Sequence, residues 1–127
     1  MSNDWKPAGY TSVSPYLISS GAQGVIDFLK ATFGAEELRR HDGPDGRIVH
    51  AEVRVGDSVV MLADATEQWP AVPSHIHVYV PDVDATYRAA LAAGGTSIRE
   101  PAHREGDDRR GGVLDPAGNS WWIATQL

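Results

Sequence analysis

The sequence predicts an α+β fold made of two β-α-β-β-β modules, because the second half of the chain repeats the pattern of the first. The segment 56–62 reappears as 118–124, and the segment 14–18 reappears as 75–79, at an offset of about 61–62 residues. A period this long indicates one supersecondary unit used twice, since neither copy can bury its apolar face alone. Equivalent positions of the two copies can therefore be compared.

The length and composition of the chain indicate its domain organisation. A chain of 127 residues that is 42% hydrophobic and 22% charged lies within the size range of one compact domain. We expect a single domain over residues 1–127, with the first module at 10–64 and the second at 74–127. The stretch 65–73 between them contains two prolines and is typical of a linker.

Helical spacing and alternation predict the elements of the first module. Val25, Phe28 and Leu29 lie on one helix face at 3.6-residue spacing, and Gly34 follows as a helix stop. The turn residues of 42–46 separate two strands. The expected elements are strands at 12–19, 36–41, 47–55 and 58–63 and a helix at 24–33.

The second module repeats this order. Asp82 is the expected N-cap of its helix, and Val83, Tyr87 and Leu91 form the expected buried stripe. The expected elements are strands at 75–80, 96–100, 109–115 and 120–126 and a helix at 82–93.

The composition argues against several functional classes. A formal net charge of -6 and only two lysines argue against a nucleic-acid surface. The chain has no cysteine, so it has neither a disulfide framework nor thiolate chemistry. It has no apolar run near the roughly 18 residues of a membrane span, and its first residues lack the pattern of a secretory leader. We expect a cytoplasmic protein without membrane association.

Alternation in strand 47–55 separates an apolar face, which begins at Val49 and should cover the helix, from a polar face. The face away from the helices is expected to carry Ser14, Tyr16, Ile48, His50, Glu52, Arg54, Val60, Leu62, His75, His77, Tyr79, Arg110, Gly112, Trp122 and Ala124. Such a mixture of aromatic and polar side chains suits a small-molecule pocket. A solvated face or a dimer interface is the alternative.

Several motifs resemble the vicinal oxygen chelate superfamily, which includes glyoxalases, bleomycin-resistance proteins and extradiol dioxygenases. They are His75 to Ala85 and Gly111 to Asn119. The stretches Lys6 to Leu17, His50 to Glu52 and Gly56 to Ser58 resemble its bacterial branch labelled 3-demethylubiquinone methyltransferase-like.

The resemblance spans residues 6–126 and carries expectations about architecture. It implies curved, cup-shaped mixed sheets with the helices on their outer face, and a twofold dimer. It does not define an activity, because one fold hosts many functions.

The resemblance also implies where a metal would bind, on the first and last strand of each module. These positions are Ser14, Val60 (Met61 if the register shifts by one residue), His75 and Trp122. Only His75 is a ligand suited to a divalent first-row metal, and one imidazole cannot build a site of three or four ligands. We therefore expect no metal and no other cofactor.

His50 and Glu52 on one face are candidates for acid–base chemistry without a metal, since an imidazole titrates near neutral pH. The alternative is a structural role, in which His50 bonds across the sheet and Glu52 pairs with Arg54 or Arg110. The sequence shows no nucleophile or oxyanion donors, which favours the structural role and leaves catalytic residues unassigned.

The leading hypothesis is a homodimeric binding protein of the glyoxalase/bleomycin-resistance type that sequesters a small aromatic or planar ligand. The alternative is a metal-dependent lyase, isomerase or dioxygenase of the same superfamily, or a metal-free acid–base enzyme. The residues expected to contact the ligand are Tyr16, His50, Glu52, Arg54, His75, His77 and Trp122.

Overall fold

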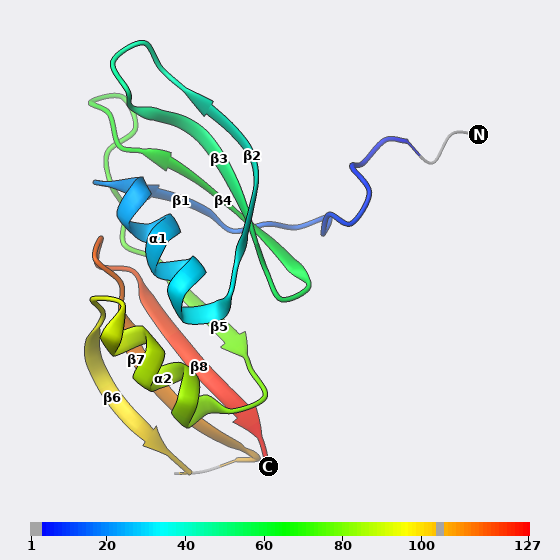
Figure 1. Cartoon of the computed structure of the whole chain (residues 1–127), viewed down its shortest axis with the longest axis vertical. Coiled ribbons are helices and arrows are strands. Elements are labelled where there is room, and N and C mark those ends of the chain that lie inside the picture. Colours follow the sequence, from blue (N-terminus) through cyan, green and yellow to red (C-terminus); the bar gives the residue numbers. More distant parts are fainter. Residues whose placement is uncertain (1–3, 104–105) are drawn as a thin grey trace.

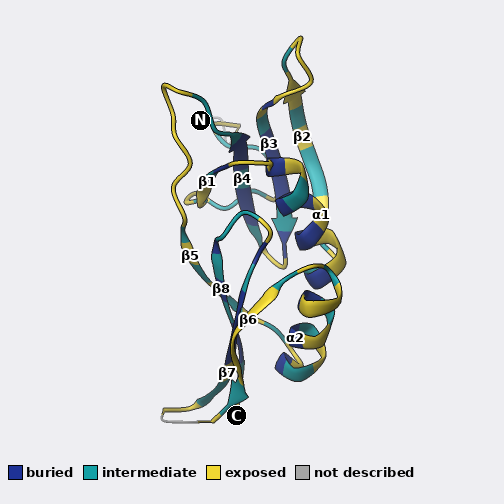
Figure 2. Cartoon of the chain, turned by 90° about the vertical axis from the view of Figure 1, so that its left-hand side faces the viewer, coloured by how far each residue is buried: buried dark blue, intermediate teal, exposed yellow. Residues whose placement is uncertain are grey.

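Two four-stranded mixed sheets, each covered by one helix, form the protein, and both helices lie on the same side of the molecule (Figures 1 and 2). The computed structural model describes residues 4–103 and 106–127. Each half of the chain follows the order strand, helix and three strands. The predicted α+β fold of two β-α-β-β-β modules is confirmed.

The first module consists of one sheet and one helix. Its elements are β1 (Tyr16–Ser19), α1 (Ala22–Phe33), β2 (Glu36–Asp42), β3 (Ile48–Val55) and β4 (Ser58–Asp64). The sheet has the order β1-β4-β3-β2, in which β1 is parallel to β4 and the other neighbours are antiparallel. Gly34 ends α1 with a φ of 66°, in the left-handed region that glycine adopts without steric cost.

The second module repeats this topology. Its elements are β5 (His75–Tyr79), α2 (Val83–Ala92), β6 (Thr96–Ala102), β7 (Asp108–Leu114) and β8 (Ser120–Gln126). The sheet has the order β5-β8-β7-β6. Asp82 caps α2 as predicted, because its carboxylate accepts a hydrogen bond from the Ala85 N–H at 3.1 Å. Leu91, expected on the buried stripe, is 38% exposed, and Ala90 is buried instead.

Two strands differ in length from the prediction. β1 begins at Tyr16 rather than at residue 12. Before it, the Pro15 carbonyl accepts from the Met61 N–H at 2.9 Å and the Thr11 hydroxyl accepts from the Val59 N–H at 3.3 Å, without a continuous ladder to β4. β6 continues to Ala102, because its pairing with β7 resumes after two register shifts and places Ala102 opposite Arg110.

One hydrophobic core lies between the helices and the sheets and joins the two modules. Leu17 and Phe28 from the first module and Trp121 from the second are buried in the same cluster. The Phe33 ring at the end of α1 lies 5.7 Å from the Trp121 ring, and α1 packs against α2. Each sheet therefore buries the face that its helix covers and leaves the opposite face open.

The facing of β4 differs from the prediction. Val60 and Leu62 belong to the buried core on the helix side, so their expected place on the open face is wrong. Met61 lies on the open face and pairs with Tyr16, as Trp122 of β8 pairs with His77 of β5. The residue equivalent to Trp122 is therefore Met61.

A bulge changes the facing at the start of β3. Ile48 pairs with Asp42 and His50 pairs with His41, so Val49 is an extra residue in the ladder. Ile48 turns into the core and is 2% exposed, whereas Val49 is 47% exposed. The sequence predicted the reverse, because strict alternation takes no account of an inserted residue.

The first helix lacks a side-chain cap of its own and receives one from β4. The residue at its N-cap is Gly21, and the Asp64 carboxylate accepts from the Ala22 N–H at 2.7 Å. The other Asp64 oxygen accepts from the Ile48 N–H at 2.8 Å. Asp64 thereby ties the start of α1 to both the third and the fourth strand.

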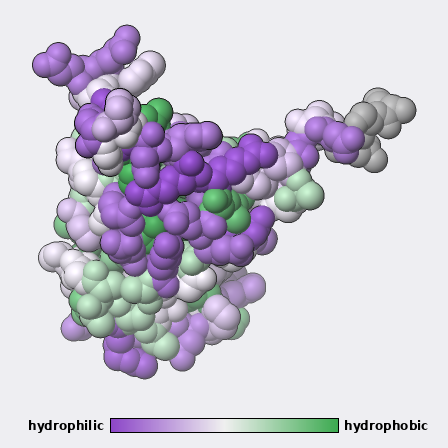
Figure 3. All heavy atoms as spheres, turned by 45° about the horizontal axis from the view of Figure 1, so that its top comes forward, coloured by the Kyte–Doolittle hydropathy of each residue, from purple (hydrophilic) through white to green (hydrophobic). Residues whose placement is uncertain are grey.

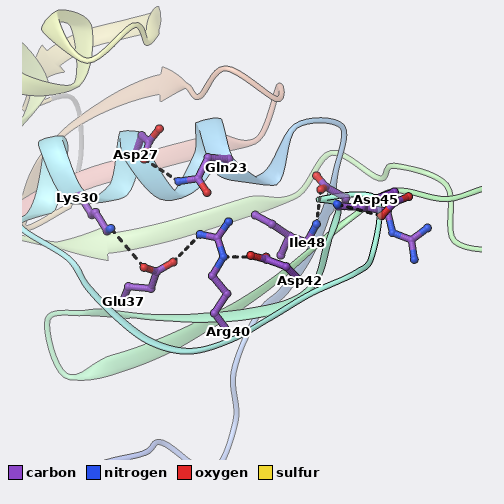
Figure 4. Close-up of polar contacts among 10 residues, drawn as sticks. Gln23, Asp27, Lys30, Glu37, Arg40, Asp42, Asp45 and Ile48 are labelled. Carbon is purple, nitrogen blue, oxygen red and sulfur yellow. Dashed lines mark hydrogen bonds and ion pairs between the residues drawn. The ribbon is translucent and has the colours of Figure 1, made fainter.

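Charged side chains connect α1 to β2 on the outer surface (Figure 4). Lys30 lies 3.6 Å from Glu37, which accepts from Arg40 at 2.9 Å, and Arg40 also donates to Asp42 at 2.9 Å. Such exposed pairs stabilise a protein only slightly. Figure 3 shows that this surface is mainly hydrophilic. Among the residues described, no helix has the length and apolar character needed to cross a membrane.

Replacing Trp121 with alanine should lower the free energy of unfolding by about 3–5 kcal/mol. The Trp121 side chain is 0% exposed, and its N–H donates to the Asp115 carboxylate at 2.8 Å. The change removes core volume and one donor from a buried carboxylate. Trp122→Ala is the matched control and should lose less stability, because Trp122 is only half-buried. Urea denaturation of both variants measures the difference, and equal losses would contradict the facing of β8.

Candidate functional site

A continuous series of hydrogen bonds crosses the open face of the first sheet. The Tyr16 hydroxyl lies 2.8 Å from His50 Nδ1, and His50 Nε2 lies 2.7 Å from Glu52 Oε2. The Tyr10 hydroxyl donates to Glu52 Oε1 at 2.5 Å. Alternation in β3 puts His50 and Glu52 on one side, and β1 brings Tyr16 beside them. We call these four residues the Glu52 chain.

The centre of the Glu52 chain is a buried carboxylate, which is 4% exposed. Burial alone would raise the pKa of the Glu52 carboxyl, but hydrogen bonds from Tyr10 and His50 outweigh burial and hold the pKa below the ordinary value of 4.5. Glu52 is therefore ionised near neutral pH, and His50 Nε2 is the donor, since a carboxylate only accepts. The predicted pairing of Glu52 with Arg54 or Arg110 is wrong, because Tyr10 and His50 occupy both of its oxygens.

The segment that precedes β1 covers the Glu52 end of this chain. Figure 1 shows this segment leaving β1 and running past the other strands of the sheet. It supplies Tyr10, whose ring centroid lies 5.4 Å from the Arg39 guanidinium. Arg54 donates to the Gly9 carbonyl at 3.3 Å and lies 3.6 Å from the Glu36 carboxylate. Arg54 therefore holds the N-terminal segment and β2, and it has no hydrogen bond with the Glu52 chain.

A pocket of about 540 Å³ lies beside the Glu52 chain, and Tyr16 belongs to both. Its lining includes the aromatic rings of Tyr16 and Trp69, which are 47% and 66% exposed. Ile18 and the bulged Val49 add aliphatic surface, and Asp64 adds a carboxylate. The volume and the mostly apolar lining suit a small organic molecule.

The open face of the second sheet is organised around Trp122. A Cβ atom at Gly112 would lie 2.6 Å from the Trp122 ring, so the glycine of β7 makes room for the indole to lie across the sheet. The Trp122 N–H donates to His75 Nδ1 at 3.1 Å, and the two ring planes differ by only 6°. Ile98 of β6 lies on the same side, near Gly112. The second module thus offers a flat aromatic surface.

A cluster of hydrogen-bonded polar side chains surrounds His77 on the same face. Arg110 donates to His77 Nε2 at 3.2 Å and to Asp108 at 3.1 Å, and Asp108 also accepts from the Tyr79 hydroxyl at 2.7 Å. Burial lowers the pKa of His77, and the Arg110 charge adds to the effect. His77 is therefore mainly a neutral hydrogen-bond acceptor at neutral pH.

The positions that the resemblance assigns to metal ligands do not fit a divalent metal. They hold Ser14, Met61, His75 and Trp122, because Met61 and not Val60 is on the open face. Indole is not a metal ligand, a thioether suits soft ions, and His75 Nδ1 already accepts a hydrogen bond from Trp122. Within residues 4–103 and 106–127, no three His, Asp or Glu side chains are grouped so that they could hold an ion.

The expected ligand-binding residues fall into separate groups. Tyr16, His50 and Glu52 come together in the first module, and Arg54 stands apart from them. In the second module, His75 is bonded to Trp122, whereas His77 is bonded to Arg110. All these hydrogen bonds stay within one module.

Sequence reasoning missed Tyr10, Val49 and Trp69. Trp69 lines the pocket, and it lies in the stretch 65–73, whose two prolines predict only a linker. An exposed tryptophan in a linker is a signal that should have drawn attention to a pocket. No sequence pattern pointed to Tyr10, since its contact with Glu52 spans 42 positions of the chain.

The chain belongs to the Glyoxalase/Bleomycin resistance protein/Dioxygenase superfamily, whose pattern it matches over residues 14–123. The resemblance inferred from the sequence is thereby confirmed. An uncharacterized protein of Mycobacterium bovis is 37% identical over 121 residues, covering 87% of this chain and 80% of that protein.

Solved structures share the fold. TioX from Micromonospora sp. ML1 has a TM-score of 0.78 at 24% identity, covering 92% of this chain and 99% of TioX. TnmS3 from Streptomyces sp. CB03234, described as an antibiotic binding protein, has a TM-score of 0.70 at 21% identity, covering 93% and 100%. At these identities the matches show a common fold.

Replacing Tyr10 with phenylalanine should lower the free energy of unfolding at neutral pH by about 1–3 kcal/mol, because the buried Glu52 loses a donor. The lowered pKa of Glu52 stabilises the fold above the ordinary value of 4.5, and this stabilisation is lost as pH falls through the lower folded-state pKa. The variant should therefore lose less stability on acidification than the parent.

Urea denaturation at neutral pH and at a series of acid pH values measures both effects. Tyr79→Phe is the matched control, because Tyr79 also donates to a carboxylate but is 63% exposed. An identical acid dependence in Tyr10→Phe and the parent would show that Tyr10 does not lower the pKa of Glu52.

Proposed function

We propose that the protein binds and sequesters a small planar aromatic molecule in the pocket between Tyr16 and Trp69. The observation that carries this proposal is the mainly apolar pocket of about 540 Å³, lined by two exposed aromatic rings. Aromatic side chains facing an open cavity favour a ligand that can stack on them, with about 0.5–1.5 kcal/mol per aromatic pair beyond area burial.

The fold is consistent with this class of ligand. TnmS3 shares the fold and is described as an antibiotic binding protein. We infer that a drug-like natural product with a planar ring system is a suitable ligand class for this chain as well. The Glu52 chain supplies hydrogen-bonding groups at one side of the pocket, which would orient such a molecule.

We propose that this binding needs no metal. The proposal is supported by the residues at the four positions of the family's metal site, where Met61 and Trp122 replace the His or Glu that a metal requires. The ligand would then be held by stacking and hydrogen bonds alone.

We further propose that the protein acts as a homodimer in which a second copy covers the open faces. The two sheets end in edge strands β1 and β5, and no ladder joins them within the described residues. Tyr16, Val49, Tyr79 and Ile98 are large hydrophobic side chains on these faces and are 40–63% exposed. A twofold contact that sets the Trp122 surface of one copy against the Tyr16 pocket of the other would bury them and enclose the ligand.

Planar aromatic compounds should bind and quench tryptophan fluorescence, and Trp69→Ala should weaken binding by about tenfold, or about 1.4 kcal/mol. Because the proposed dimer sets Trp122 over the pocket, Trp122→Ala should weaken binding by a similar factor. Titrations with a chelator present should give unchanged affinities. The exposed Trp5, 76% exposed and outside the pocket, supplies the control Trp5→Ala, which should bind as the parent does. If a broad screen of planar aromatic compounds finds none that binds, the proposal is wrong.

Light scattering should give about twice the chain mass of 13.7 kDa at micromolar concentration, because the open faces need a partner. Tyr79→Glu should shift the protein toward the monomer, since it places a charge on a face that we propose to be covered. A parent protein that is monomeric in this measurement would refute the dimer.

A further inference from the structure

The Glu52 chain combines a carboxylate, an imidazole and a hydroxyl in that order. Glu52 Oε2 and His50 Nε2 are 2.7 Å apart, and His50 Nδ1 and the Tyr16 hydroxyl are 2.8 Å apart. An ordered series of this kind lets an imidazole take a proton from a hydroxyl group, because the carboxylate fixes its tautomer and stabilises the imidazolium that forms. At one end, Tyr16 lines the pocket, and at the other end the Glu52 carboxylate is buried.

The direction of each hydrogen bond follows from the charge of Glu52. The ionised carboxylate accepts from His50 Nε2–H, so Nδ1 of a neutral His50 carries a free lone pair and accepts the Tyr16 O–H. Tyr10 donates to the second oxygen of Glu52 and keeps the carboxylate from turning away. The free nitrogen of His50 is therefore directed at Tyr16, the member of the Glu52 chain that lines the pocket.

We propose that the Glu52 chain accepts the proton of an acidic hydroxyl group, so that the pocket binds phenols and enols as their anions. This inference rests on the proposed function and adds the chemical class of the ligand. The O–H bond of the ligand breaks and its proton passes to the Tyr16 oxygen, while the Tyr16 proton passes to His50 Nδ1. No electrons are transferred and no covalent bond to the ligand forms. The products are a ligand anion and an imidazolium that lies against the Glu52 carboxylate.

Other ionisable groups near the site do not compete for this role. Asp64 also lines the pocket, but its two oxygens accept from the Ala22 and Ile48 amides. Arg47 lines the pocket as a cation and favours an anionic ligand. Arg39 lies against the Tyr10 ring and is not among the residues that line the pocket.

The second module has no equivalent arrangement among its described residues. Its two candidate imidazoles, His75 and His77, accept hydrogen bonds from Trp122 and Arg110. Among the described residues, neither His75 nor His77 is hydrogen-bonded to a carboxylate, whereas His50 is bonded to Glu52. The proton acceptor is therefore specific to the first module.

The test uses 2-hydroxyanthraquinone, a planar phenol whose absorption spectrum changes on ionisation, and 2-methoxyanthraquinone, which has no proton to lose. Bound to the parent protein, the phenol should show the spectrum of its anion at a pH where the free phenol is neutral. Its acid dissociation constant should rise by at least about tenfold, or one pKa unit. The methyl ether should bind without a spectral change.

Three variants separate proton transfer from simple binding. Tyr16→Phe, His50→Gln and Glu52→Gln should each lose most of the spectral shift while still binding the methyl ether. His41→Gln is the matched control, because His41 is exposed and lies opposite His50 in the neighbouring strand. It should keep the full shift. Tyr16→Phe alters an exposed side chain, so it tests the inference even where a change at the buried Glu52 prevents folding.

The outcomes distinguish the proposed proton transfer from the proposed binding of aromatic molecules. Binding of the methyl ether together with a phenol that stays neutral would overturn the proton transfer and leave the aromatic binding site in place. A shift that persists in Tyr16→Phe and His50→Gln would also overturn it, since another group would then be the acceptor. If neither compound binds, both the inference and the aromatic pocket are wrong.

Discussion

The shared core around Trp121 is the constraint on which the rest of the structure depends. Each sheet covers its own helix, and α1, α2 and Trp121 pack together, so the helix-side face of every strand is committed to burial. Strand side chains alternate, so the residues between the buried ones lie on the open faces. These are Tyr16, His50 and Glu52 in the first module and His75, His77 and Trp122 in the second. The core thus determines which residues are available for binding.

Burial of Glu52 then determines the chemistry of the first module. A carboxylate taken from water is costly unless donors satisfy it, and here Tyr10 and His50 do so. The same contacts fix the tautomer of His50 and direct its remaining nitrogen to Tyr16. A requirement of stability, a satisfied buried charge, therefore orients the imidazole toward Tyr16, which lines the pocket. The N-terminal segment takes part in this, although it belongs to no regular element.

The repeat made the fold predictable, because turn residues and apolar spacing recur in both halves and agree with local propensity. The open-face position of Trp122, His50 and Glu52 followed from alternation alone. The prediction was wrong where the strands are irregular. The bulge at Val49 turns Ile48 into the core and leaves Val49 exposed, the reverse of the expected facing. A one-residue ambiguity in the repeat assigned Val60 to the open-face position that Met61 occupies. The pairing of Tyr10 with Glu52 was beyond sequence reasoning, since a loop contact across 42 positions leaves no periodic signal.

The two modules put different chemistry into one framework. At equivalent positions, Met61 pairs with Tyr16 in the first sheet, whereas Trp122 lies across the face of the second sheet and requires Gly112 beside it. The first module keeps a cavity and a base, and the second presents a flat ring supported by His75. A planar hydroxylated molecule needs both, a surface to stack on and an acceptor for its proton. The first face combines the Tyr16 and Trp69 rings with the His50 acceptor, and in the proposed dimer the Trp122 ring of a second copy would add a further surface for stacking.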